Sequence, residues 1–159
     1  YMGGGILPIA FYKGKIYFLF SREYSKSKTK KGLWSDFGGS REKGETYEET
    51  AIREGHEESN YILGSKKDII DLVNNSLYEI TINKYRTYIV LIDYDQELPK
   101  RFRQEFLYVK HNKPDLVSKK NGLYEKDMLK WYSYKDIKND YNKFRPFYKN
   151  IVKRILQLF

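Results

Sequence analysis

The sequence predicts an α/β or α+β protein whose elements form layers around one sheet, because strand and helix patterns alternate along the whole chain. The chain has 159 residues, which favours a single domain, residues 1–159, with one hydrophobic core. Apolar residues make up 40% of it and aromatic residues 17%, a composition that excludes a disordered chain.

The predicted strands are rich in β-branched and aromatic residues. They are Gly5–Tyr12, Lys15–Arg22, residues 33–39, Leu77–Ile82, Arg86–Asp95 and Leu129–Tyr134. A turn at Lys13-Gly14 joins the first two strands. The polar, basic segment EYSKSKTKKG, residues 23–32, is predicted to be the loop that follows them.

Four helices are predicted from capping and periodicity. Thr46 and Glu49 form a T-x-x-E capping box, so the first helix starts at about Tyr47. A second helix follows Ser65 as N-cap, and a third covers Lys100–Lys110. The last helix starts at Pro146 and carries an apolar stripe at helical spacing, which we interpret as core packing. That stripe consists of Phe147, Ile151, Ile155 and Leu158.

The composition also narrows the partners and the compartment. The net charge of +9 favours polyanions such as nucleic acid, nucleotides or inositol phosphates, although a lysine-rich proteome would explain it equally well. The chain has no cysteine, which excludes disulfides and thiolate metal sites and fits a cytoplasmic location. No apolar run approaches the roughly 20 residues of a membrane span, so no membrane contact is expected.

The first helix combines features that are locally unfavourable. Glu54 and Glu58 are like charges at i,i+4, which costs about 0.2–0.5 kcal/mol, and Gly55 costs up to roughly 1 kcal/mol relative to alanine. A solvated acidic face is the ordinary explanation, but no lysine lies on this helix despite the lysine-rich composition. A divalent cation resolves the conflict, because oxygen ligands gathered on one face suit Mg²⁺ or Mn²⁺.

This stretch resembles the Nudix box, G-x5-E-x7-R-E-U-x-E-E-x-G-U, in which U is aliphatic. The matching positions within the box, residues 39–61, are Gly39, Glu45, Arg53, Glu54, Glu57 and Glu58. Gly55 replaces an aliphatic residue and Asn60 replaces the final glycine, but neither change removes a metal ligand. The resemblance implies a Nudix α/β/α sandwich with a mixed central sheet over nearly the whole chain.

The resemblance also implies a pyrophosphohydrolase that acts on a nucleoside diphosphate linked to another group. Glu45 would hold Arg53, and either Glu54 or Glu57 would be the general base. The implied ligands of Mg²⁺ or Mn²⁺ are Glu54, Glu57, Glu58 and the Gly38 carbonyl oxygen. An additional acidic ligand from outside the box would be Glu125 or, second, Glu105, and an ordinary surface glutamate is an equal alternative for each.

Substrate contacts are predicted from charge and aromaticity around the box. The residues expected to receive phosphates are Arg22, Lys28, Lys31 and Arg41, for which a solvated loop is the alternative. Phe37, Tyr24 or Trp34 would stack on a base, although Trp34 better suits the core. A second basic set, Lys100 to Lys110, would extend this surface beyond what a mononucleotide needs.

This extended surface favours the RNA 5′ end as substrate, with cap hydrolysis releasing a 7-methylguanosine nucleotide. The segment WSDFGGSREKGE also resembles viral-type Nudix proteins, which would place the protein in the host cytoplasm. Dinucleoside polyphosphates, diphosphoinositol polyphosphates and nucleoside triphosphates are the alternative substrates. A Nudix-fold module that binds RNA without catalysis is the alternative of a different class.

Overall fold

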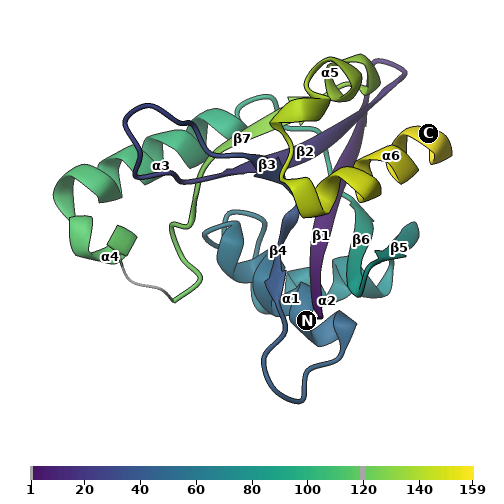
Figure 1. Cartoon of the computed structure of the whole chain (residues 1–159), viewed down its shortest axis with the longest axis horizontal. Coiled ribbons are helices and arrows are strands. Elements are labelled where there is room, and N and C mark those ends of the chain that lie inside the picture. Colours follow the sequence, from purple (N-terminus) through teal and green to yellow (C-terminus); the bar gives the residue numbers. More distant parts are fainter. Residues whose placement is uncertain (1, 119–120) are drawn as a thin grey trace.

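The computed structural model describes residues 2–118 and 121–159, and they form an α/β/α sandwich around a mixed sheet (Figure 1). The strands are β1 (Gly3–Tyr12), β2 (Lys15–Glu23), β3 (Trp34–Ser35), β4 (Phe37–Ser40), β5 (Tyr78–Ile82), β6 (Tyr85–Leu91) and β7 (Lys126–Tyr132). The helices are α1 (Tyr47–Glu58), α2 (Lys66–Asn74), α3 (Leu98–Asn112), α4 (Pro114–Ser118), α5 (Tyr134–Asn139) and α6 (Lys149–Leu158). Two 3-10 turns, η1 (Tyr141–Lys143) and η2 (Pro146–Tyr148), precede α6.

Strands β1 and β2 are paired only over part of their length, and they diverge beside the segment that leads into α1. β1 pairs with β6 in parallel and with β2 and β4 antiparallel, which confirms the mixed sheet. β2 leaves β1 beyond Phe18 and pairs instead with β3 and β7. The short β3–β4 segment therefore lies where β1 and β2 diverge, and it carries the residues that lead into α1.

Alternation along the central strands divides the core into two layers, as the period of two in a strand requires. Ile6 and Leu19 point to one face, where they pack with Ala51 of α1 and with residues of α2 and α3. Leu7 and Phe20 point to the other face, which α5, η2 and α6 cover. The C-terminal stripe is core, as predicted, since Ile151 and Ile155 are fully buried.

Several predicted boundaries are wrong for local reasons. β6 ends at Leu91 rather than Asp95, and β7 spans residues 126–132 because Ser133 caps α5 instead of continuing the strand. The strand predicted at residues 33–39 is interrupted at Asp36. Its carboxylate is buried and accepts hydrogen bonds from Tyr85 and Thr87.

The last helix also begins later than predicted. Pro146 opens a 3-10 turn, α6 follows from Lys149, and Phe147 is 39% exposed rather than part of the buried stripe. Within the described ranges, no helix is long and apolar enough to cross a membrane.

Candidate active site

Helix α1 begins at its predicted position and packs unusually close to the sheet. The capping box is formed, because the Thr46 hydroxyl accepts from the Glu49 N–H and the Glu49 carboxylate accepts from the Thr46 N–H, both at 3.1 Å. Gly55 lies against β1, where an added Cβ would be 2.8 Å from Ile6 Cδ1 and 2.9 Å from Cγ1. Ile6 therefore fills the space of the missing aliphatic side chain and lets the helix approach the sheet.

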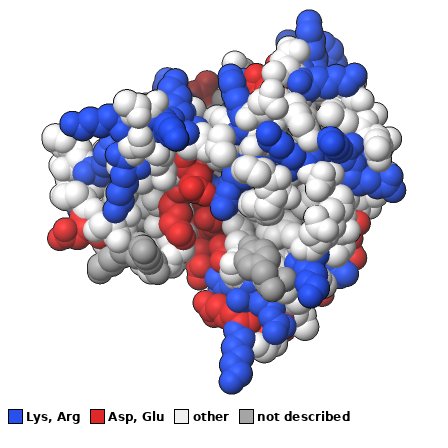
Figure 2. All heavy atoms as spheres, viewed as in Figure 1, with Lys and Arg blue, Asp and Glu red and all other residues white. Residues whose placement is uncertain are grey.

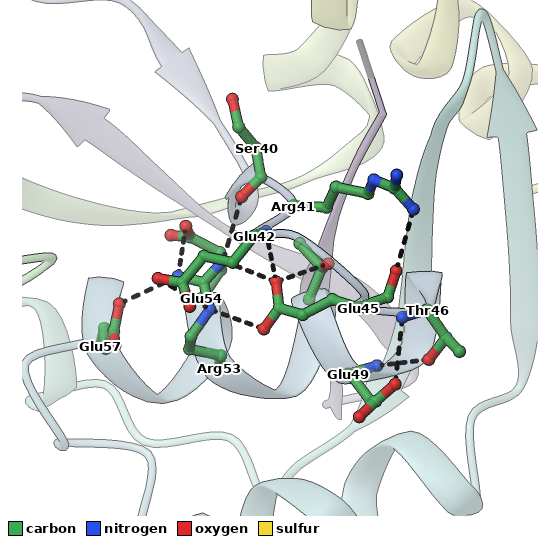
Figure 3. A network of polar contacts seen from close by, with 10 residues as sticks. Ser40, Arg41, Glu42, Glu45, Thr46, Glu49, Arg53, Glu54 and Glu57 are labelled. Atoms are coloured by element: carbon green, nitrogen blue, oxygen red, sulfur yellow. Dashed lines mark hydrogen bonds and ion pairs between the residues drawn. The ribbon is translucent and has the colours of Figure 1, made fainter.

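Arg53, in the middle of α1, contacts acidic residues of this helix and of the loop that precedes it (Figure 3). Its guanidinium donates to both carboxylate oxygens of Glu45, at 2.9 and 3.0 Å, and to the Ser40 carbonyl at 3.0 Å. The same group donates to Glu54 at 2.9 Å and to Glu57 at 3.4 Å. One side chain thus joins the loop before α1 to two carboxylates of the helix, and the Glu45–Arg53 contact forms as the sequence indicates.

Glu58 is held by a separate, buried set of contacts. Its carboxylate accepts from the Gly38 N–H at 3.0 Å and lies 3.8 Å from the ammonium of Lys126. The Lys126 side chain is only 1% exposed, and it also donates to the Ser35 hydroxyl at 3.0 Å. Glu58 therefore lies between a strand N–H and a buried cation from β7.

Burial sets the protonation of these carboxylates. It raises the pKa of Glu54 from its ordinary 4.5 to about 7, against the lowering effect of Arg53. It also raises the pKa of Glu57 and of Glu58, with Arg53 and Lys126 respectively opposing the rise. Hydrogen bonds from Arg53 lower the pKa of Glu45 to about 2, so this residue is ionised at neutral pH. The pKa of Glu45, which precedes the helix, is therefore lowered, whereas the pKa of each of the three helix carboxylates is raised.

Glu54 and Glu58 border a cleft of about 440 Å³, whereas Glu57 and Glu45 are not among the described residues that line it. The lining includes Gly38, Gly39, Arg41, Glu54, Glu58 and Glu125. Figure 2 shows the acidic side chains gathered in a hollow at the middle of this face, with lysine and arginine side chains on both sides. Arg41 and Glu125 thus lie in the same cleft as Glu54 and Glu58, and their roles as phosphate contact and metal ligand stay predictions.

The donor chemistry fits a divalent cation, although the carboxylates are not arranged around one. In residues 2–118 and 121–159, no group of three acidic or histidine side chains forms a ready ligand set. Arg53 instead engages Glu54 and Glu57. Repulsion from Glu57 and Glu125 contributes to the raised pKa of Glu54, so a hard cation would relieve it. The residues that would hold Mg²⁺ or Mn²⁺ are Glu54, Glu57, Glu58 and Glu125, beside Gly38.

The alternative ligand and one stacking residue lie elsewhere. Glu105 is exposed on α3 and is not among the described residues that line the cleft. Phe37 is completely buried in the core below α1, so the prediction that its ring stacks on a base is wrong. Because side chains alternate along β4, the Phe37 ring points into the core, while the next residues, Gly38 and Gly39, line the cleft. Trp34 is 7% exposed and belongs to the core.

The predicted phosphate contacts divide between two pockets. Arg41 lines the acidic cleft, whereas Arg22, Lys28 and Lys31 line a separate pocket of about 240 Å³ together with Lys110 of α3. Arg22 is not free there, because its guanidinium makes two hydrogen bonds to Asp127, at 2.9 and 2.8 Å. The two basic sets of the sequence therefore meet, but beside the cleft rather than inside it.

Sequence reasoning missed two cations of the site. Lys126 lies before the predicted strand Leu129–Tyr134, and only the pairing of β7 with the end of β2 brings it to Glu58. Arg145 lines the cleft from the C-terminal layer. The dipeptide Arg145-Pro146 was a weak signal for it, since the residue before a proline is held in an extended conformation.

Fold and site together define a pyrophosphohydrolase of the α/β/α class. The family model of the NUDIX domain matches residues 9–155. The chain therefore belongs to the Nudix family of hydrolases, which act on nucleoside diphosphate derivatives and generally use divalent metal ions. No curated protein sequence matches it significantly.

Solved structures with this fold have little sequence in common with the chain. An Ap4A hydrolase from C. elegans, in a binary complex, has a TM-score of 0.57 at 13% identity and covers 98% of this chain and 96% of its own. A bifunctional NMN adenylyltransferase/ADP ribose pyrophosphatase from Francisella tularensis, complexed with AMP and a Mn ion, has a TM-score of 0.55 at 18% identity. It covers 99% of this chain and 42% of its own. At these identities the likeness shows the fold alone.

Proposed function

We propose that this Nudix hydrolase cleaves the pyrophosphate linkage of an RNA 5′ cap and releases a 7-methylguanosine nucleotide. The observation that carries the proposal is the basic pocket next to the acidic cleft. Lys28, Lys31 and Lys110 line this pocket, and at its border the Tyr24 N–H donates to the backbone carbonyl of Glu125, a residue of the cleft, at 2.8 Å. A chain of phosphates that leaves the cleft over β2 would reach these lysines, whereas a mononucleotide would not.

The chain's own residues would divide the chemical work. Bound divalent cations would neutralise the phosphate oxygens and lower the pKa of a water molecule. Glu54 and Glu57 are candidates for the general base, because both accept from Arg53 and both have a raised pKa. Arg53 and Glu45 would keep the helix carboxylates in register with the loop at Ser40.

The first test is a product assay with Mg²⁺ or Mn²⁺. The substrates are capped RNA, the free cap dinucleotide, diadenosine tetraphosphate, nucleoside triphosphates and an inositol pyrophosphate. Cleavage of capped RNA in preference to the free cap supports the proposal, and preference for a small substrate contradicts decapping while retaining the hydrolase. Glu57→Gln is the control, and we expect it to lower kcat by about 10²–10⁴-fold.

A matched pair of double variants tests the basic pocket. K28Q/K110Q removes two lysines of the pocket, and K67Q/K153Q removes two exposed lysines outside it. We expect only the first pair to lower kcat/KM for capped RNA, while both pairs cleave the free cap like the unaltered protein. The slope of log affinity against log salt should fall by about 1.4 in the first pair, since each single-strand phosphate contact contributes about 0.7.

Dinucleoside polyphosphates are the second candidate, because the cleft of about 440 Å³ accommodates only part of a nucleic acid and the Ap4A hydrolase shares the fold. Equal effects of K28Q/K110Q and K67Q/K153Q on the cleavage of every substrate would favour a dinucleoside polyphosphate as the substrate. Tight RNA binding without turnover would instead indicate a non-catalytic module. The viral-type resemblance and the cytoplasmic location stay predictions.

A further inference from the structure

Arg145 is fixed at the cleft by its backbone. The residue is extended, with φ −58° and ψ 139°, as expected before Pro146. Its N–H donates to the Trp34 carbonyl at 2.8 Å, and the neighbouring Phe144 forms a parallel bridge to Trp34. Both Trp34 and Phe144 are buried, so the segment that carries Arg145 is anchored to the core.

The side chain of Arg145 is oriented but only weakly neutralised. Its guanidinium lies over the Phe147 ring, 4.8 Å from the centroid, and its Nε is 3.3 Å from a carboxylate oxygen of Glu23. The side chains of Arg145 and Glu23 are 34% and 48% exposed. An ion pair at this exposure contributes little, so an anion of higher charge can replace Glu23.

Arg145 enters the cleft from the helical layer opposite to α1. The same cleft has Glu54 and Glu58 of α1 along another part of its lining. Its other arginines are in different situations: Arg53 is committed to Glu45, and Arg41 is on an exposed loop. Arg145 is thus the cleft guanidinium that combines an anchored backbone with an exchangeable partner.

We propose that Arg145 binds the phosphate chain of the substrate, and that Glu23 is the counter-ion that the phosphate displaces. A planar guanidinium matches two oxygens of one phosphate, and the Phe147 ring limits its motion. With cations held by the α1 carboxylates, a phosphate chain in the cleft would have Arg145 as a partner on the opposite part of the lining. The role depends only on a phosphate chain, so it holds for capped RNA and for the smaller substrates alike.

The test measures binding as well as turnover. Isothermal titration calorimetry with imidodiphosphate in Mg²⁺ gives an affinity that does not depend on knowing the substrate. We expect R145Q to weaken this binding about tenfold, and R145K to give an intermediate value. With the substrate that is cleaved fastest, R145Q should raise KM by a similar factor and change kcat by less than about threefold. E23Q should tighten binding by about two- to fivefold, because it removes the competing carboxylate.

R154Q is the matched control, since Arg154 is an exposed arginine on α6 whose Nη1 donates to Gln157 at 3.2 Å. Affinities of R145Q and R154Q that agree within error would overturn the proposal, as would a loss confined to kcat. If R145Q melts well below the unaltered protein, E23Q carries the test with Arg145 intact. Unchanged or weaker imidodiphosphate binding in E23Q would then refute the assignment.

Discussion

Replacing Gly55 with alanine sets helix propensity against packing at a single position. In an exposed helix interior, alanine is more favourable than glycine by about 0.8–1 kcal/mol. Here the new Cβ would lie 2.8 Å from Ile6 Cδ1 and 2.9 Å from Cγ1, and Ile6 is fully buried. Overpacking of a well-filled core costs about 1–3 kcal/mol. We therefore expect G55A to lower the free energy of unfolding by about 1 kcal/mol.

Urea denaturation followed by circular dichroism measures this difference, and the melting temperature should fall by about 2–4 °C for a chain of this size. A second substitution identifies the cause. I6V removes the Cδ1 atom and alone costs about 0.5–1.5 kcal/mol. I6V keeps the Cγ1 atom, which the new Cβ would meet at 2.9 Å, so in this background G55A should still destabilise the protein but by less than in the unaltered chain. The double-mutant cycle then gives a coupling of about 0.5–1 kcal/mol.

A G55A protein that is more stable than the unaltered chain would refute the packing argument, because propensity would then outweigh the contact with Ile6. A destabilisation that I6V does not relieve would mean that another contact of α1 opposes the side chain. Either result would mean that contact with Ile6 is not the reason for a glycine at position 55.

Three further predictions concern charge and burial. Because the pKa of Glu45 is lowered to about 2, its ion pair with Arg53 stabilises the fold fully above pH 4.5 and is lost as the pH falls towards 2. E45Q should therefore remove the fall in melting temperature that this ion pair causes between about pH 4.5 and about pH 2. The pKa of Glu54 is raised to about 7, so without metal the ionisation of Glu54 lowers the stability of the fold as the pH rises from 4.5 to 7. Mg²⁺ should therefore raise the melting temperature more at about pH 8 than at about pH 6, and E54Q should reduce that difference. Y85F removes the 2.7 Å hydrogen bond to buried Asp36 and should cost about 1–3 kcal/mol in urea denaturation, whereas Y108F, on an exposed ring, should cost less than about 0.5 kcal/mol.

The predictable part of the site is the part that one helix and its preceding loop contain. The spacing of Arg53, Glu54, Glu57 and Glu58 is local, so a capping box and a helical period were enough to place these side chains together, while the position of Glu45 followed from the resemblance to the Nudix box. Asn60 was also predictable, because asparagine tolerates the left-handed conformation at a helix end and has a φ of 51° here. Local rules succeed where the contacts are local.

The unpredicted part depends on pairing between distant strands. Arg22 looked like a free phosphate contact until β7 placed Asp127 against it. The same pairing brings Lys126 to Glu58, and no periodicity in one strand specifies which residue of the other it faces. Phe37 was misassigned because its strand is short, and a short strand gives too few residues to establish which face points inward.

One partly buried cation, Arg53, and one buried cation, Lys126, explain how so many carboxylates share one cleft. Arg53 lies 2.9 Å from Glu54, and Lys126 lies 3.8 Å from Glu58, so each helix carboxylate of highest pKa has a cation of its own. These cations compensate only part of the burial, since the pKa of Glu54 still rises to about 7. The remaining repulsion favours the binding of a divalent cation. Fuller neutralisation would stabilise the protein further but would weaken the attraction for metal, so an incompletely compensated cleft is what a metal-dependent hydrolase requires.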